Sequence, residues 1–341
     1  MDKKLGEKIR GIVVNEPRRY DAYERYYQHM LNVMREGETK EAVAGLKWLS
    51  ELIMERIPEL ADGSGIVRDL VRLQREVLVA AGKYDFDSFM LALEFNRKPN
   101  EQFWRPRRRH LMPICRALQA MEDGELDELF LSCPPRIGKT ALVNMFICWV
   151  MGRNSERSNL YCSFTAKPVE TFYDGLLEIL KDPVTYAYGD IFPGTKLVGT
   201  NANDTTLDLD RKKKYHSFTG RPIGGSLNGS CDSNGYIIGD DLCSGIEEAL
   251  SKERMAALWY KVDNNFITRA KEHCKRLWIG TRWSLVDPQG IRLDLLRNDV
   301  RYAGVRWKYI NTPALDAEEH SNFEYSYGVG FSTEYYMMRR A

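Results

Sequence analysis

One stretch constrains the fold of this chain more than any other: Ser-Cys-Pro-Pro-Arg-Ile-Gly-Lys-Thr at positions 132–140. The short run before it, residues 127–131, predicts a buried strand. The run after it, residues 141–151, is apolar at nearly every position and predicts a buried helix. A strand, a tight loop with Gly-Lys-Thr and a helix are the context in which a phosphate-binding loop is credible. The sequence therefore predicts an α/β fold with such a loop.

The residues of this loop suit the binding of a nucleotide and Mg²⁺. Backbone N–H groups turn inward toward an anion, and the following helix begins with its positive end facing that anion. We expect the charge of Lys139 near the β- and γ-phosphates and the Thr140 hydroxyl on Mg²⁺. Cys133 stands where the strict pattern has a glycine, and a chance helix start is the alternative interpretation. The loop residues expected to hold nucleotide are Pro135, Arg136, Ile137, Gly138, Lys139, Thr140 and Ala141.

Overall charge and cysteine usage narrow the possible partners and compartments. The net charge is +1, so binding to nucleic acid has to be argued from local basic patches. Seven cysteines without a Cys-x-x-Cys spacing indicate reduced thiols in a cytosolic protein rather than disulfides or a zinc site. The longest apolar run is far shorter than the roughly 20 residues that span a bilayer, so we expect no membrane partner.

The apolar spacing divides the chain into three expected parts. Residues 1–98 show three- and four-residue steps typical of a helical domain, in which a tyrosine stripe is core or, alternatively, a partner surface. One of its helices should begin near Thr39 and stop before Pro58. Residues 99–310 alternate strands with helices, apart from polar, glycine-bearing loops up to about residue 232. Residues 311–341 should begin a linker.

A basic and aromatic cluster, residues 102–110, comes one expected helix (residues 111–121) before the loop. A bound base must stack on something near the loop, so Gln102 and Trp104 are expected to contact it. The alternative is a solvated charged turn. A second basic run, Arg211, Lys212, Lys213 and Lys214, is expected either to contact DNA phosphates or to form a solvated face.

Two carboxylates follow another expected strand, Tyr-Ile-Ile-Gly at positions 236–239. Asp240 is expected on the metal side, and Asp241 is expected to orient and deprotonate an attacking water. Many strands end in Asp, so this pattern acquires weight only together with the loop about a hundred residues upstream. A further strand, residues 276–280, ends in Thr281 and Arg282, which either sense the γ-phosphate or form a plain turn. The last strand is expected over residues 302–310.

The order of these motifs resembles the ATPase half of the large terminase subunit of tailed bacteriophages. Pro-Pro-Arg-Ile-Gly-Lys-Thr, then Ile-Gly-Asp-Asp, then Gly-Thr-Arg-Trp carry the resemblance, from about Phe103 to the end of the chain. Pro-Pro-Arg before the loop and Thr-Arg-Trp after the later strand are fairly specific to that family. Residues 1–98 carry no motif of it.

The resemblance implies an ASCE-type P-loop fold with a mostly parallel central sheet, flanked by helices and preceded by the helical domain. It implies ATP and Mg²⁺ as cofactors, and catalytic roles for Lys139, Asp241 and Arg136. Many relatives carry Glu at the position of Asp241, so Glu247 and Glu248 are alternative bases. The family's loop arginine is absent, because Leu-Asn-Gly-Ser stands at 227–230, and Arg136 or Arg221 is expected to serve instead. Thr281 and Arg282 match the family's coupling motif.

The implied activity is ATP-driven translocation of double-stranded DNA into a procapsid. The implied partners are the portal protein, the small terminase subunit and other copies of this chain, in a ring on the portal and as a monomer in isolation, within the host cell cytoplasm. The family's nuclease domain would follow residue 341, so no nuclease activity is expected of these residues. The alternatives are a helicase-like or kinase-type P-loop enzyme and a non-hydrolysing, nucleotide-gated scaffold that docks on portal or capsid proteins.

Overall fold

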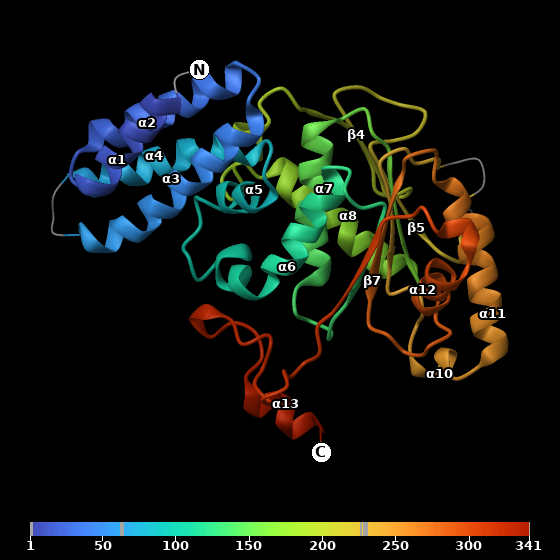
Figure 1. Cartoon of the computed structure of the whole chain (residues 1–341). Coiled ribbons are helices and arrows are strands. Elements are labelled where there is room, and N and C mark those ends of the chain that lie inside the picture. Colours follow the sequence, from blue (N-terminus) through green and yellow to red (C-terminus); the bar gives the residue numbers. More distant parts are fainter. Residues whose placement is uncertain (1–2, 62–64, 226, 228–230, 341) are drawn as a thin grey trace. The chain divides into compact units, whose positions relative to one another are not determined.

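The computed structural model describes residues 3–61, 65–225, 227 and 231–340 (Figure 1). The chain divides into two compact units. The first holds the residues up to Asn96 together with Asp190–Phe192, and the second holds Arg97–Gly189 and the residues from Pro193 onward.

The first unit is built from five helices. Their bounds are α1 Lys3–Asn15, α2 Tyr20–Arg35, α3 Thr39–Glu59, α4 Ile66–Gly82 and α5 Phe86–Leu93. The predicted stripe of α2 is largely core, since Tyr23, Tyr27 and Met30 are buried against apolar side chains of α3 and α4. The expected stop before Pro58 is wrong: α3 runs through Pro58 to Glu59. A proline in the last turn removes one N–H and leaves the rest of the helix paired, so the helix tolerates it.

The second unit contains one sheet of eight strands in the order β3-β4-β5-β2-β6-β7-β1-β8. The strand bounds are β1 Glu128–Ser132, β2 Asn159–Ser163, β3 Leu197–Asn201, β4 Thr206–Leu209, β5 Phe218–Pro222, β6 Tyr236–Asp240, β7 Lys275–Gly280 and β8 Trp307–Asn311. β5, β2, β6, β7, β1 and β8 pair in parallel, whereas β3 and β4 pair antiparallel at one edge. β1, β2 and β6 are buried along their whole length, as central parallel strands require. The chain is therefore α/β with a mostly parallel sheet.

Helices cover both faces of this sheet (Figure 1). α7 and α8 lie on one face, and α11 and α12 lie on the other. The helix bounds are α6 Trp104–Glu122, α7 Lys139–Arg153, α8 Ala166–Lys181, α9 Tyr188–Ile191, α10 Ile246–Ala249, α11 Lys252–Lys261, α12 Pro288–Asn298 and α13 Thr333–Arg340. Eleven residues of α7 are buried, which agrees with its apolar sequence.

Several sequence expectations about the second unit are wrong. The glycine-bearing stretch expected as loops holds three strands, β3, β4 and β5. The helix expected over 111–121 begins earlier, at Trp104, so most of the basic cluster lies on α6 rather than before it. The last strand begins at Trp307 rather than 302, because Val300–Tyr302 form a short 3-10 turn.

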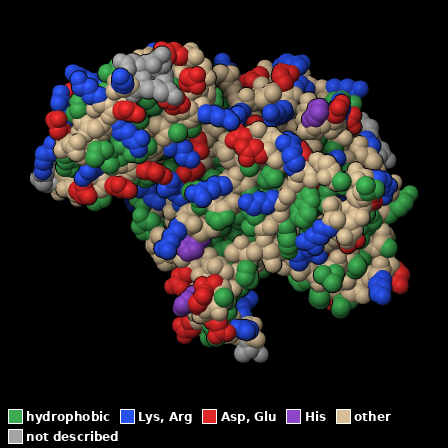
Figure 2. All heavy atoms as spheres, in the orientation of Figure 1, with side chains coloured by type: hydrophobic (Ala, Val, Ile, Leu, Met, Phe, Trp, Pro, Cys, Tyr) green, Lys and Arg blue, Asp and Glu red, His purple; other side chains and the backbone are tan. Residues whose placement is uncertain are grey.

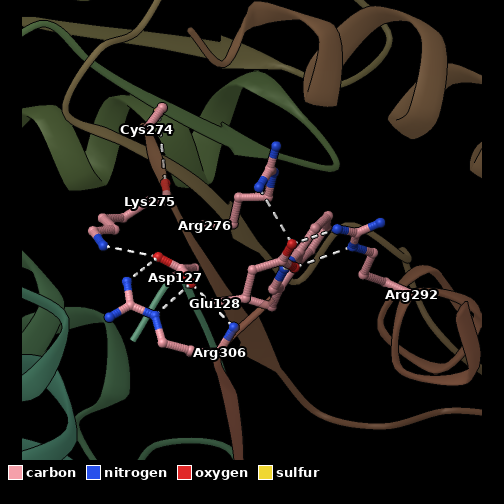
Figure 3. Close-up of polar contacts among 8 residues, drawn as sticks. Asp127, Glu128, Cys274, Lys275, Arg276, Arg292 and Arg306 are labelled. Atoms are coloured by element: carbon pink, nitrogen blue, oxygen red, sulfur yellow. Dashed lines mark hydrogen bonds and ion pairs between the residues drawn. The ribbon is translucent and has the colours of Figure 1, made fainter. Parts of the chain in front are cut away.

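A charged network lies at the amino ends of β1, β7 and β8 (Figure 3). Glu128 has no exposed surface and accepts hydrogen bonds from Arg292, Arg276 (3.3 Å) and the Trp278 indole N–H (3.2 Å). Beside it, Asp127 accepts from Lys275 (3.1 Å) and from the Arg306 side chain (2.7 and 3.0 Å). Hydrogen bonds from Arg306 hold the pKa of Asp127 well below its usual range.

Glu128→Gln is expected to destabilise the protein by about 3 kcal/mol, because it leaves the buried Arg292 charge without its counter-charge. Chemical denaturation should show a lower midpoint with an unchanged slope. Glu125→Gln, an exposed substitution of the same kind three residues earlier, is the control and should leave the midpoint unchanged. Equal midpoints for the two variants would contradict a stabilising role of the Glu128 network.

The described residues also bear on the expectations about membrane spans and about the cysteines. None of their helices is both long enough and apolar enough to cross a lipid bilayer. All seven cysteines are buried, and none of them forms a disulfide.

Candidate nucleotide-binding site

The loop that joins β1 to α7 has a backbone that only a few residue types accept. Gly138 has φ 102°, and a Cβ there would lie 2.7 Å from the Phe103 ring. Glycine is therefore required at 138 both by the left-handed backbone and by the close approach of a side chain. Arg136 is also left-handed, with φ 65°, and its side chain is exposed at the rim of the loop.

Burial divides the loop into an inner and an outer part. Ile137 and Lys139 are buried. Pro135, Arg136, Thr140 and Ala141 are exposed. The Lys139 ammonium folds back into the loop and donates to the carbonyls of Cys133 (2.6 Å) and Pro134 (2.7 Å). Burial lowers the pKa of Lys139, and the nearby Asp241, Cys133 and Asp240 oppose that shift.

Asp240 ends β6 and faces the start of α7. Its Oδ2 accepts from the Thr140 hydroxyl (3.2 Å) and from the Tyr161 hydroxyl (2.8 Å). Its Oδ1 is buried and accepts no hydrogen bond from any described residue. Burial, with a contribution from Asp241, raises the pKa of Asp240 to about 7. A cation at this point would favour the ionised carboxylate.

These residues fit Mg²⁺. Mg²⁺ keeps several waters and is usually held by one or two carboxylates together with substrate phosphates, rather than by a cage of protein ligands. An orphaned buried oxygen of Asp240 beside the Thr140 hydroxyl offers that kind of partial site. No cluster of three or more His, Cys, Asp or Glu with metal-ligand geometry occurs among the described residues.

Asp241 is held toward the neighbouring strand, β7. It has φ 43°, and its Oδ1 accepts from the backbone N–H of Thr281 (3.0 Å). β7 lies between β1 and β6, so this bond joins the second carboxylate to the Thr281-Arg282 turn. The alternative bases differ in position: Glu247 is exposed, and Glu248 accepts from the backbone N–H of Ser244 (2.7 Å).

Arg282 is engaged within its own turn. Its Nε donates to Asp287 (2.9 Å) and its terminal nitrogen donates to the Ser284 carbonyl (2.8 Å). Asp287 in turn caps α12 by accepting from Gly290 N–H (2.8 Å). A small pocket adjoins this turn and is lined in part by Asp241, Thr281 and Gln289. The structure therefore places Arg282 at the end of β7 but turned toward α12.

Gln102 and Trp104, the residues expected to contact a bound base, are both buried. Trp104 has no exposed surface, so its ring is not accessible to a base. Gln102 is buried and donates to the Arg97 carbonyl (2.9 Å). Phe103, the residue between them, is the aromatic ring that lies on the loop at Gly138. The expectation began the following helix at residue 111, whereas α6 begins at Trp104, and this earlier start turns the Trp104 side chain into the core.

The arginine alternatives also differ in position. Arg221 donates to the carbonyls of Asp204 and Gly220, so it is held beside β5. Arg136 lies at the rim of the loop with its side chain exposed. The positions 228–230, where the resemblance places an arginine that this chain lacks, lie outside the described residues.

The basic run 211–214 lies at the opposite edge of the sheet from the loop. It follows β4, whose end meets the beginning of β5, and it contacts the turn before β2. Arg211 pairs with Glu156, and Lys213 donates to the Ser155 carbonyl. Lys212 and Lys214 are exposed. Positive and negative side chains are interspersed over the face drawn in Figure 2.

The structure thus brings Lys139, Thr140, Asp240, Asp241 and Thr281 to the carboxyl ends of β1, β6 and β7. Two further residues that the sequence did not single out contact these residues or their loop: Tyr161, in the middle of β2, and Tyr325, far along the chain. No local pattern marks either tyrosine. A scan against protein-family models and a search of curated proteins each found no match to this chain.

Proposed function

We propose that this chain is the ATP-hydrolysing motor of a genome-packaging terminase, which translocates double-stranded DNA into a procapsid. One observation carries the proposal: Lys139, Thr140 and Asp240 meet where β1 turns into α7 beside the end of β6. Phosphate oxygens are bound by backbone N–H groups and a lysine, and Mg²⁺ is bound by a hydroxyl and a carboxylate. All of these groups occur together at the carboxyl ends of β1 and β6. One strand, β7, separates the two motif strands, as the ASCE-type P-loop fold expects.

Lys139 has to change partners when nucleotide binds. Among the described residues, its hydrogen-bond acceptors are the carbonyls of Cys133 and Pro134 rather than a carboxylate. A phosphate is a stronger acceptor for an ammonium than a carbonyl is, because the bond is charge-assisted. The side chain would swing outward over the loop while the N–H groups at the start of α7 hold the phosphates.

The two carboxylates have different tasks in this proposal. Bound Mg²⁺ would neutralise charge that develops on the phosphates. Asp240 would hold that ion's hydration shell through Oδ1, with Oδ2 fixed by Thr140 and Tyr161. Asp241 would orient the attacking water and accept its proton. The hydrogen bond from the Thr281 N–H would couple this change in the charge of Asp241 to the end of β7.

The proposal is tested by ATP turnover of the purified chain with and without double-stranded DNA. A motor hydrolyses ATP faster when DNA is present, and portal protein or small terminase subunit should increase turnover further. A kinase-type enzyme would instead phosphorylate an added acceptor. A nucleotide-gated scaffold would bind ATP without hydrolysing it, and that result would overturn the proposal.

The DNA contact is tested through the two exposed lysines of the basic run. Lys212→Ala/Lys214→Ala is expected to lower the salt dependence of DNA binding by up to about 0.9 in slope per lost phosphate contact. Basal hydrolysis should not change, since the run lies at the other edge of the sheet. Lys8→Ala/Lys40→Ala removes the same charge from exposed sites in the helical unit and is the control. An unchanged salt slope in the first variant would identify the run as a solvated loop.

A further inference from the structure

A tyrosine far along the chain reaches the loop. The Tyr325 hydroxyl donates to the backbone carbonyl of Ile137 at 3.0 Å, across 188 positions of sequence. Both residues are buried: Tyr325 is 4% exposed and Ile137 is 1% exposed. Burial raises the pKa of Tyr325, so the hydroxyl stays protonated and able to donate.

The segment that carries Tyr325 is built to present it. Glu324 and Gly330 form an antiparallel bridge, and Tyr325 N–H donates to the Val329 carbonyl (2.9 Å), which closes a tight turn. Gly330 has φ 94°, and a Cβ there would lie 2.1 Å from the Phe323 carbonyl oxygen. The turn is therefore fixed by its own backbone, with Tyr325 on its inner side.

Side chains of α6 also contact the Tyr325 ring. His110 meets the Tyr325 ring edge-on at 5.4 Å between centroids, and the Arg107 guanidinium lies 5.2 Å from the ring centroid. Arg107 also lies over the Phe103 ring, at 4.6 Å, and Phe103 contacts Gly138. The loop is thus enclosed on this side by rings from α6 and from the C-terminal turn.

The carbonyl that Tyr325 binds belongs to the peptide between Ile137 and Gly138. In a trans peptide the C=O and the N–H point in opposite directions, so the direction of one sets the direction of the other. A hydrogen bond that fixes the Ile137 carbonyl toward Tyr325 therefore aims the Gly138 N–H at the opposite side of the loop. Without the hydroxyl, the buried carbonyl would lack this partner, and rotation of the peptide would become less costly.

We propose that Tyr325 is a positioning residue for nucleotide binding: it holds the 137–138 peptide so that the Gly138 N–H is directed at the phosphate before nucleotide arrives. The inference rests on the proposed ATP site. Preorganisation of this kind improves affinity, since less of the loop's freedom is lost on binding. Tyr325 does not contact Lys139, Asp240 or Asp241 in the described hydrogen bonds, so the chemical step should not depend on it.

Tyr325→Phe tests this proposal, because it removes the hydroxyl and keeps the ring. In the nucleotide-free protein, amide exchange over 136–139 should accelerate about three- to tenfold, the equivalent of one hydrogen bond. The Kd and KM for ATP should rise by the same factor, whereas kcat at saturating ATP should stay within about twofold. Tyr327→Phe, at an exposed tyrosine two residues along the same turn, is the matched control and should behave as wild type.

Two results would overturn the proposal. One is unchanged exchange over 136–139 in Tyr325→Phe. The other is a lower kcat at unchanged KM, which would indicate a smaller folded fraction rather than a displaced peptide. Absence of ATP binding by the wild-type chain would remove the proposed function instead, and the exchange measurement would still decide whether Tyr325 holds the loop.

The same bond has a reciprocal consequence. A contact that improves nucleotide binding must itself be stabilised by nucleotide, by an equal factor. ATP should therefore slow amide exchange over 323–331 about three- to tenfold in the wild type and leave it unchanged in Tyr325→Phe. Equal slowing in both proteins would show that another contact couples this turn to the loop.

Discussion

Lys139→Ala should abolish ATP hydrolysis, with a loss of about 10³-fold, while the fold is retained. The ammonium is buried within the 133–140 loop, where it would stabilise charge that develops on the transferred phosphoryl group. The turn itself is set by the left-handed conformations of Gly138 and Arg136, and the ammonium adds hydrogen bonds to the carbonyls of Cys133 and Pro134. Steady-state turnover at saturating ATP measures the loss.

The control for Lys139→Ala is Lys167→Ala, at an exposed lysine in the first turn of α8. Its turnover should equal that of the wild type. Lys139→Ala should still unfold in one cooperative thermal transition, because alanine is well accepted at the start of a helix and the substitution removes only the hydrogen bonds to the Cys133 and Pro134 carbonyls. Turnover near the wild-type rate in a folded Lys139→Ala protein would remove this loop from the active site.

Asp241→Asn should bind Mg²⁺ and ATP but lose turnover by about 10²–10⁴-fold, the usual contribution of a general base. Asparagine has the size of aspartate, and its oxygen can still accept from the Thr281 N–H, so the geometry at the end of β7 is kept. Asp240→Asn should differ, because it removes the charge beside Thr140 and should weaken the Mg²⁺-dependent part of binding. Single-turnover hydrolysis and ATP affinity, with and without Mg²⁺, separate the two effects.

The alternative bases provide the counter-test. Glu248→Gln should hydrolyse ATP normally, since Glu248 is occupied in capping Ser244, and Glu247→Gln should do the same from its exposed position. Normal turnover in Asp241→Asn, combined with loss in either glutamine variant, would assign the base to that glutamate.

Sequence reasoning succeeded where local signals were strong. β1, α7 and β6 are central elements, so their sequences are continuous apolar runs next to polar residues. Such runs can be recognised from the sequence without knowing which strand or helix lies beside them. β3 and β4 carry no such signal. β3 is mostly exposed, and β4 is only four residues long, so their strand character depends on pairing with each other and with β5.

Other wrong or missing predictions concern a helix end at a proline and contacts between residues that are far apart in the sequence. The stop expected before Pro58 is wrong because that proline lies in the last turn of α3, where it removes one N–H and leaves the rest of the helix paired. Tyr161 reaches Asp240 across 79 positions and Tyr325 reaches Ile137 across 188, so tertiary packing alone brings these pairs together. The candidate site was therefore predictable as a set of motifs, whereas the groups that orient those motifs were not.

The pairing of β8 with β1 connects residues 312–340 mechanically to the strand that precedes the 133–140 loop. The two strands run in parallel from Glu128↔Trp307 to Ser132↔Asn311, and residues 312–340 continue from the end of β8. A pull on that segment along the strand loads all the bonds of the pair in shear at once, rather than one after another as in peeling. Arg306, bound to Asp127 just before β8, anchors the far end. Tension applied beyond residue 312 is therefore carried by the same strand that leads into the 133–140 loop.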